Sequence, residues 1–498
     1  MSEGVIVAIL KKIGGHTLIY FTGSLASGAI GFLMIPFYTH FLVPADYGLL
    51  ELLDLTIFLI GSVVGLGLNA AIYRFYYEQQ TEPLRYEVIS TALLFGISLG
   101  AVLYVILFVS SPGISSAIFK TDRYSSYLRL AFVALCLDTV GELALSHLRS
   151  KQLSLRVTLF SLARLSIGLT LNVYFIGFLR LGVLGALYSG LIASGMMTTA
   201  LVAMALREVG IRFSGPRLTA MLRYGVPLIP LTLGLFVLNF ADRFFLQRYA
   251  NLGEVGVYSL GYKFGMVSTG LIVAPFLQFW SAYMYEVVER HEGRELIARL
   301  QVYFTFVLIT FTLALSLLSR ELLKMLSPPE YWGAARVVPI VGLGYVFMGL
   351  SHFFRVGLYY TKQTKYLGYA VGGSALLNFP LNLALIPPFE AMGAALATLV
   401  SFAVLALAVL GASHRVFPIR YQYVRLFKLV FAGTIVYGAA EFIRPEALLP
   451  AVAIDLLFLA SFPGLLLALA FYEEPELKKM REIAHATTRR LGLNARTP

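Results

Sequence analysis

Charged residues are scarce in this chain. Asp, Glu, Lys and Arg make up only 13% of its 498 residues, whereas hydrophobic residues make up 58%. A soluble protein carries roughly 25% charged residues and about 45–50% apolar ones. The deficit extends over the whole length, and the mean hydropathy is +0.78. No soluble fold buries that much apolar surface, so lipid must be the solvent for most of it.

Cysteine and catalytic motifs are also lacking. The single cysteine, Cys136, lies in an apolar run, which excludes a disulfide framework and a thiolate metal site. The sequence has no phosphate-binding glycine loop, no paired metal-ligand histidines and no nucleophile elbow. We therefore expect no enzyme activity, no metal and no cofactor, and any work must draw on an ion gradient, the membrane potential or a substrate gradient.

Apolar runs long enough to cross a bilayer recur from end to end. A span needs about 20 mostly apolar residues. By this criterion the sequence predicts an all-α integral membrane protein with about fourteen spans, near residues 15–41, 48–73, 88–112, 125–147, 157–179, 181–206, 224–247, 255–284, 300–319, 337–358, 367–387, 391–411, 427–443 and 449–471.

The distribution of basic residues predicts the orientation. The net charge of +12 lies in short clusters between apolar runs, which is typical of topology determinants and not of a nucleic-acid-binding surface. With fourteen spans and a cytoplasmic N-terminus, the inner segments hold 26 lysines and arginines and the outer segments hold 8. Because basic residues accumulate on the cytoplasmic side, we expect a multi-pass protein of the inner (plasma) membrane with both termini cytoplasmic.

The chain contains an internal repeat at a shift of 208 residues. Phe37–Gly48 aligns without gaps with Phe245–Gly256, and Gly185-Ala186 falls on Gly393-Ala394. Chance similarity between apolar helices is the alternative, but the matches include turn residues and acids. Each unit holds six spans, so the units share an orientation and a pseudo-two-fold axis along the membrane normal. The predicted organisation is an N-lobe (1–206), a cytoplasmic linker (207–223), a C-lobe (224–412), two further spans (413–472) and a cytoplasmic tail (473–498).

Three stretches carry a family resemblance. They are Phe37–Gly48, Ala241–Leu246 followed by Glu254–Tyr258, and Asn382–Pro387 followed by Gly393–Thr398. In their order and spacing they resemble the Wzx-type polysaccharide exporters and O-antigen flippases of the multidrug/oligosaccharidyl-lipid/polysaccharide exporter superfamily. The chain departs from the family pattern at Pro388-Phe389-Glu390, where the hairpin turn often has a glycine.

The resemblance implies a V-shaped transporter with two lobes, alternating access and a polar cavity open to lipid at its side. It implies transfer of polyprenyl-diphosphate-linked oligosaccharide from the cytoplasmic to the outer leaflet for cell-surface polysaccharide such as lipopolysaccharide O-antigen. Membrane lipids, a polysaccharide polymerase and glycosyltransferases are the implied partners. The alternative is a MATE-like ion-coupled exporter of small cationic molecules, which predicts twelve spans and acidic cavities. A membrane-embedded glycosyltransferase would need a large extramembrane loop that this sequence lacks.

Basic residues inside the spans are candidates for substrate binding. A charge at the centre of a span costs about 2.5–3.5 kcal/mol, so each one indicates a function or a partner. Lys263 aligns with Leu55, the neighbour of Asp54, so the two lobes would present a cation and an anion at equal depth. The alternative is that the long basic side chains extend to the headgroup regions. We predict that four cations line the cavity and attract the diphosphate of the lipid carrier: Lys263, Arg243, Arg74 and Arg355.

Acidic residues inside the spans are candidates for ion coupling. Asp138 and Glu142 lie four residues apart on one face of the fourth span. Arg164 in the fifth span lies at the depth of Glu142, which predicts a Glu142–Arg164 ion pair that holds the two helices together. In the alternative, Asp54, Asp138 and Glu142 are candidates for a proton or sodium site. Glu51 and Asp54 also fit plain interfacial charges.

The topology is testable with reporter fusions at the two ends of the chain. An even number of spans and the 26 to 8 distribution of basic residues place both chain ends on the cytoplasmic side. At each end we expect a fluorescent-protein fusion to fluoresce and an alkaline phosphatase fusion, which needs an oxidising compartment, to be inactive. Two ends on different sides of the bilayer would contradict the predicted fourteen spans.

Overall fold

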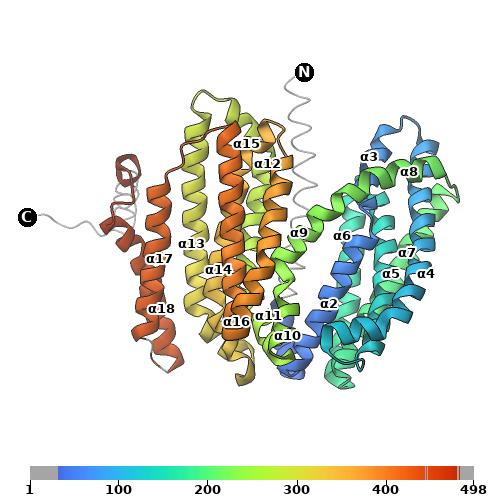
Figure 1. The fold of residues 1–498 in the computed structure, drawn as a ribbon, viewed down its shortest axis with the longest axis horizontal. Helices are drawn as coiled ribbons and strands as arrows, with labels where there is room; N and C mark the ends of the chain where they lie inside the picture. The colour runs from blue at the N-terminus through green and yellow to red at the C-terminus, as the bar shows by residue number, and fades with distance from the viewer. Residues whose placement is uncertain (1–31, 444, 446, 479–481, 483–498) are drawn as a thin grey trace, which may run out of the picture.

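The computed structural model describes residues 32–443, 445, 447–478 and 482. These residues are helical throughout, with short turns and no strand in the described part of the chain. Two helical bundles lie side by side, and a pair of C-terminal helices flanks the second bundle (Figure 1). The predicted all-α membrane fold is confirmed.

The first bundle corresponds to the predicted N-lobe. Its first long span bends because Leu66 and Gly67 have φ of 47° and 65°, and Gly67 lies against the backbone of Gly225. Residues 32–41 are helical and precede this span. The other elements are α2 (Pro44–Val64), α3 (Leu68–Glu78), α4 (Glu82–Phe119), α5 (Ser125–Ser150), α6 (Ser154–Asn172) with its continuation η1 (Val173–Phe178), and α7 (Gly182–Val209).

A broken helix connects the bundles. Tyr224 at the end of α8 packs edge-to-face against Phe75 of α3, with ring centroids 6.4 Å apart, so α8 belongs to the first bundle. Gly234 of α9 faces Val371 in the second bundle. The predicted linker 207–223 is therefore not only a loop, because α8 begins inside it. The elements are α8 (Gly215–Gly225), η2 (Val226–Leu228), α9 (Ile229–Phe240) and α10 (Asp242–Tyr249).

The second bundle corresponds to the predicted C-lobe, and two further helices follow it. The elements are α11 (Leu252–Ser268), η3 (Thr269–Val273), α12 (Ala274–Glu289), α13 (Gly293–Leu326), η4 (Pro329–Arg336), α14 (Val338–Phe354), α15 (Val356–Tyr360), α16 (Lys365–Val416), α17 (Tyr423–Ile443) and α18 (Leu448–Ala468).

The segment labelled α16 is a helical hairpin and not one straight helix. In a straight helix, Asn378 and Ser401 would lie about 35 Å apart, yet the Asn378 amide donates to the Ser401 hydroxyl at 3.0 Å. The chain reverses at Glu390, which has φ 47° and ψ −125°. An L-residue in such a conformation costs about 1–3 kcal/mol. The exporters that the sequence resembles often have a glycine at this turn, so this chain has a non-glycine residue in a glycine-like conformation.

Eleven helical segments of the described chain are long and apolar enough to cross a membrane. The fourteen predicted spans differ from these eleven in three places. The first predicted span, 15–41, lies mostly outside the described residues, α5 is not among the eleven, and 367–387 and 391–411 both fall within α16. The chain is a multi-pass membrane protein, and the count of fourteen stays a prediction. The predicted tail helix also lies mostly outside the described residues.

Repeat-related elements begin at matching positions. Pro44 begins α2 and Leu252 begins α11, and these residues are separated by the repeat shift of 208. The same shift relates Gly182, which begins α7 with φ 57°, to Glu390 at the hairpin in α16. The turn before the last helix of each lobe therefore has a residue with positive φ at the matching position, which is glycine in one lobe and glutamate in the other.

A reciprocal glycine contact joins the two lobes. A Cβ atom added to Gly48 would overlap the carbonyl oxygen of Leu252 and lie 2.9 Å from the nitrogen of Gly256. A Cβ atom added to Gly256 would overlap the carbonyl oxygen of Pro44 and lie 3.1 Å from the nitrogen of Gly48. Each contact is the image of the other under the repeat, as for residues beside a two-fold axis. Backbones approach this closely only where both side chains are absent.

The lobes meet at one end of the molecule, which we call the closed end. It contains the first turns of α2 and α11, and there the Tyr331 hydroxyl donates to the Leu42 carbonyl at 2.7 Å and Lys120 Nζ donates to the Arg248 carbonyl at 2.6 Å. Toward the opposite end the helix axes of the two lobes diverge, and α9 crosses obliquely between them (Figure 1). We call that opposite end, with loops 79–81, 151–153, 210–214 and 290–292, the basic end.

Substituting Gly256 with valine should open the closed end. Overpacking costs about 1–3 kcal/mol, and each 1.4 kcal/mol shifts an equilibrium about tenfold. Spin labels at Lys120 and Arg248, introduced in a Cys136→Ser background, report the separation of the lobes. We expect a longer distance in Gly256→Val. Gly270→Val is the matched control, because a Cβ atom at Gly270 meets nothing within 4 Å. An unchanged distance in Gly256→Val would refute the role of this contact.

Candidate functional site

An ion pair between the lobes is formed by Lys263 of α11 and Glu51 of α2. Lys263 Nζ lies 2.7 Å from Glu51 Oε2 and donates to the Tyr47 hydroxyl at 3.0 Å. Lys263 lies eleven residues into α11, about 16 Å from its start. Its side chain is 40% exposed, whereas that of Glu51 is 12% exposed. The ammonium group is thus held by the opposite lobe and is still accessible to a ligand.

Asp54 lies one turn beyond Glu51 on α2. It is exposed, and it makes no hydrogen bond or ion pair with another described residue. The sequence predicts a cation and an anion on opposing lobes at the depth of Lys263 and Asp54. The acid that pairs with Lys263 is Glu51, one turn nearer the closed end. Sequence reasoning missed this role because it took Glu51 for an interfacial charge.

Arg243 is buried inside the C-lobe. Its side chain is 1% exposed, and Nη1 lies 2.6 Å from Asp242 Oδ1. The guanidinium carbon lies 3.7 Å from the ring centroid of Tyr262. Asp242 accepts further hydrogen bonds from the Tyr258 hydroxyl and, at 3.1 Å, from the Thr398 hydroxyl. Arg243 therefore neutralises a buried carboxylate and, in this conformation, presents no free charge to a ligand between the lobes.

Arg74 and Arg355 lie apart from Lys263. Arg74 is an exposed residue of α3 at the basic end, where it pairs with Glu78 at 2.9 Å and its guanidinium stacks 4.7 Å from the Tyr224 ring. Arg355 follows the last turn of α14 and donates to the Ser351 hydroxyl at 3.1 Å. It forms no ion pair with a described acid. The structure therefore does not gather the four predicted cations into one cluster.

The N-lobe contains a second charged group, on α5 and α6. Arg164 Nη2 lies 2.7 Å from Asp138 Oδ1 and donates to the Ser194 hydroxyl at 3.2 Å. Glu142 pairs instead with Arg149 of its own helix, at 3.1 Å. The predicted Glu142–Arg164 pair is therefore wrong by one helical turn. Asp138 and Glu142 share a helix face, and the sequence did not determine which of them is level with Arg164.

The sequence matches a known family. Residues 13–280, more than half of the chain, match the family model described as polysaccharide biosynthesis protein. The chain belongs to this family. No curated protein matches the sequence significantly.

Solved structures share the fold of this family member. A lipid II flippase MurJ in an inward closed conformation matches with a TM-score of 0.73 at 14% identity, over 92% of this chain and 99% of that one. A MATE-family multidrug resistance transporter in an inward-facing conformation matches with a TM-score of 0.57 at 14% identity, over 83% and 95%. A transporter of the same MOP superfamily from Pyrococcus furiosus gives 0.53 at 12% identity, over 82% and 94%. At these identities the likeness shows a fold of the MurJ and MATE type.

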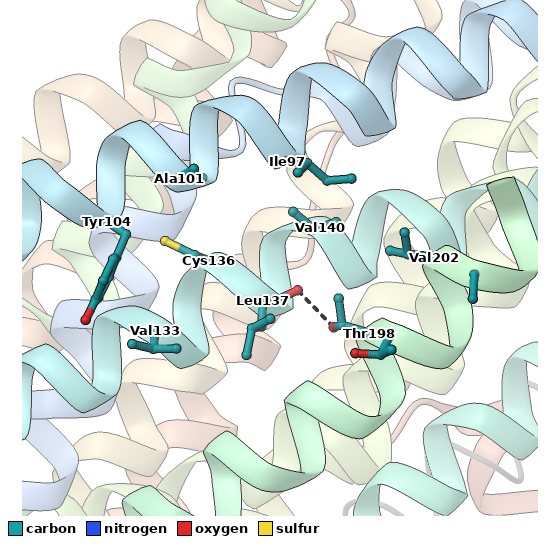
Figure 2. Close-up of a pocket in the computed structure, with 12 residues that line it drawn as sticks. Ile97, Ala101, Tyr104, Val133, Cys136, Leu137, Val140, Thr198 and Val202 are labelled. Carbon is teal, nitrogen blue, oxygen red and sulfur yellow. Dashed lines mark hydrogen bonds between the residues drawn. The ribbon is translucent and has the colours of Figure 1, made fainter. Parts of the chain in front are cut away.

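The N-lobe of this polysaccharide biosynthesis family member has an apolar pocket away from these charges. It has a volume of about 470 Å³ and lies between α4, α5 and α7, with Cys136 and Tyr104 in its wall (Figure 2). The Thr198 hydroxyl faces the carbonyl of Leu137, to which it donates at 2.9 Å, so it is not free for a ligand. The lining fits hydrocarbon and offers no basic side chain for a diphosphate.

Removing the Arg164 side chain should destabilise the N-lobe of this protein, because Asp138 loses its ion-pair partner. A carboxylate without a partner at this depth costs about 1–3 kcal/mol, less than in a fully buried pair, because both side chains are partly exposed. We expect Arg164→Ala to lower Tm in detergent and Asp138→Ala/Arg164→Ala to recover most of the loss. If the double variant melts as early as the single one, the pair does not hold the helices together.

Proposed function

We propose that this protein is a flippase that moves polyprenyl-diphosphate-linked oligosaccharide from the cytoplasmic to the outer leaflet by alternating access, in cell-surface polysaccharide biosynthesis. Membership of the polysaccharide biosynthesis protein family and the fold shared with a lipid II flippase support the proposal. The single observation that carries it is an accessible lysine ammonium in an ion pair between the two lobes. That group can bind the diphosphate. Because it also forms an ion pair between the lobes, binding of the diphosphate can alter the contact between them.

The conformation fits a state that receives substrate from the cytoplasmic leaflet. The lobes are joined at the closed end and diverge toward the basic end (Figure 1). Because basic residues mark cytoplasmic segments, we assign the basic end to the cytoplasm of a cell with this protein in its inner membrane. The distribution of basic residues along the sequence predicts the two chain ends on the same side. Arg74 lies at the basic end and is placed to attract the anionic headgroup as it approaches.

Lys263 would couple substrate binding to opening of the closed end. A diphosphate carries several acceptor oxygens and competes with Glu51 for the ammonium group. Once Lys263 turns to the diphosphate, the ion pair between α2 and α11 is lost. The closed end is then held chiefly by the glycine contact and by the hydrogen bonds from the Tyr331 and Lys120 side chains to backbone carbonyls. A ligand shifts a conformational equilibrium only by its differential affinity for the two states. When the diphosphate replaces Glu51 as the partner of Lys263, the ligand binds the open state more tightly than the closed one.

The energy source fits an ion gradient or the membrane potential. The sequence has no nucleotide-binding motif, so the coupling group should be a side chain within the lobes. Asp54 is the candidate between the lobes, and Asp138 with Glu142 is the candidate inside the N-lobe. Arg243 and Arg355 are predicted to join the substrate path only in other conformations of the transport cycle.

Asp54 favours a second candidate function, that of a MATE-like exporter of small cations. An exposed carboxylate without a partner among the described residues would attract a cationic drug. The fold likeness to MATE transporters has lower TM-scores than that to the lipid II flippase. An exporter of this kind should lose transport in Asp54→Asn and keep it in Lys263→Gln, which is the reverse of the flippase pattern.

The flippase proposal predicts that transport depends on a cation at position 263. A charge-assisted hydrogen bond to a diphosphate contributes about 1.5–3 kcal/mol, and each 1.4 kcal/mol is about tenfold. We expect Lys263→Ala to lower the rate of lipid-linked oligosaccharide translocation in proteoliposomes at least about tenfold and to lower the affinity for the substrate. Lys263→Arg should retain most of the rate.

Substitutions at Glu51 distinguish substrate binding by Lys263 from a purely structural role of the Lys263–Glu51 ion pair. Lys263→Ala leaves Glu51 unpaired, so a loss of transport alone is ambiguous. Glu51→Ala/Lys263→Ala removes both charges and should restore thermal stability but not transport. Glu51→Gln frees the ammonium group and should bind substrate at least as tightly as the unmodified protein. Normal transport by the double alanine variant would refute the assigned role of Lys263.

A further inference from the structure

A polar pocket lies inside the N-lobe between α5, α6 and α7, and we call it the N-lobe polar pocket. It has a volume of about 370 Å³, which is within the range of small-ligand sites, about 300–1,000 Å³. Charged groups from α5 and α6 and a hydroxyl group from α7 converge on it. The residues used below are Asp138, Glu142, Phe160, Ser161, Arg164 and Ser194.

The depth and exposure of the pocket indicate that it opens to a polar space. Asp138 lies thirteen residues into α5, about 20 Å from its start and near the middle of the membrane. Its side chain is 31% exposed and that of Arg164 is 42% exposed. Charges with this exposure at mid-membrane depth would be costly against hydrocarbon. In Figure 1, α6 lies on the side of the N-lobe nearer the C-lobe, whereas α4 lies on the far side.

The two pockets of the N-lobe therefore differ in chemistry and in place. The apolar pocket of Figure 2 lies between α4, α5 and α7, toward the far side. The N-lobe polar pocket lies between α5, α6 and α7, toward the C-lobe. Thr198 belongs to both walls, and its hydroxyl is taken up by the Leu137 carbonyl. Of these two pockets, the N-lobe polar pocket is the one with charged groups in its wall, and it lies on the side of the N-lobe nearer the C-lobe (Figure 1).

The two acids that line the polar pocket are both paired, which limits the ligand that it fits. Asp138 pairs with Arg164 at 2.7 Å, and Glu142 pairs at 3.1 Å with Arg149, which is not part of the pocket lining. Acids that already have a basic partner select strongly for neither a cation nor an anion. It offers carboxylate acceptors, guanidinium donors and hydroxyls that can do both, beside an aromatic ring, Phe160. That combination suits a neutral ligand with many hydroxyl groups.

The pocket wall also leaves room for a ring. A Cβ atom added to Gly190 of α7 would meet nothing within 4 Å, and one added to Gly168 of α6 would only touch Ala193 at 4.0 Å. Both glycines line the pocket. Glycine inside a helix costs roughly 0.5–1 kcal/mol relative to alanine, and neither position is crowded. The absent side chains therefore widen the pocket and do not serve close helix packing.

We propose that the N-lobe polar pocket is a sugar subsite that binds one sugar ring of the lipid-linked substrate while Lys263 binds the diphosphate. This inference rests on the proposed flippase function and adds to it a place for the sugar. The carboxylates and the Arg164 guanidinium bind the ring hydroxyls, and Phe160 covers one face of the ring. The sugar is then held by the N-lobe while Lys263 of the C-lobe holds the diphosphate, so the headgroup bridges the two lobes.

Filling the pocket tests the proposal. Gly190→Leu places a side chain in open space, removes a helix-destabilising glycine and occupies the volume of the ring. Gly113→Leu is the matched control, because a Cβ atom at Gly113 in α4 also meets nothing within 4 Å and Gly113 lies in neither N-lobe pocket. Ser161→Leu, from the α6 wall, fills the pocket from the other side and serves if Gly190→Leu does not fold.

The measurement is the ratio of two affinities, for polyprenyl diphosphate that carries one hexose and for bare polyprenyl diphosphate. We expect the unmodified protein and Gly113→Leu to prefer the sugar-bearing lipid about tenfold or more, and Gly190→Leu to bind both lipids equally, with its affinity for the bare lipid unchanged. A preference for the sugar that persists in Gly190→Leu and Ser161→Leu overturns the subsite, and so does a loss of affinity for both lipids alike. Absence of a preference in the unmodified protein also overturns it. Failure of the unmodified protein to bind either lipid refutes the proposed function itself.

Discussion

The contact between Gly48 and Gly256 is the constraint on which the arrangement of the two lobes depends. The first turns of α2 and α11 approach until the backbone of each occupies the space where the other would carry a Cβ atom. The contact is reciprocal under the 208-residue repeat, so it lies beside the axis that relates the lobes. Two helices that touch through backbone can tilt about the contact without unpacking large side chains. The closed end can therefore serve both as a seal and as a pivot.

Several charges inside the membrane are neutralised by a partner in the same lobe, and one pair joins the two lobes. Arg243 neutralises Asp242, Arg164 neutralises Asp138, and each pair lies within one lobe. The Lys263–Glu51 pair differs because its partners lie on different lobes and its cation is accessible. A pair inside a lobe stabilises one conformation of that lobe. A pair between lobes stabilises one arrangement of the two lobes, and a ligand that competes for it changes that arrangement.

Some of the site could be predicted from the sequence, because a charge in an apolar run is visible without a structure. Lys263 was predicted to face an acid of α2, and it does so, but the acid is Glu51 and not Asp54. Asp138 and Glu142 were predicted to share a face toward Arg164, and the choice between them was wrong. Arg243 was predicted to be accessible, but it is 1% exposed, because its neighbour Asp242 turns into the same lobe interior. In each case the predicted partner or orientation differs from the observed one by about one helical turn or by a rotation of one helix about its axis.

The sequence by itself determined that lipid is the solvent, that the elements are helices, that the chain is a repeat with a shift of 208, and which family it resembles. The first three properties follow from composition and from periodicity along one chain, and the resemblance follows from three short stretches in their order and spacing, so none of them needs knowledge of spatial neighbours. The tertiary structure alone decided which charges pair, which glycines touch, which end of the molecule is closed, and that a polar pocket lies between α5, α6 and α7. The 3.6-residue period specifies the face of a helix but neither its rotation nor its depth relative to the next helix. A shift of one helical turn, about 5.4 Å, is enough to place a different carboxylate beside the same basic residue.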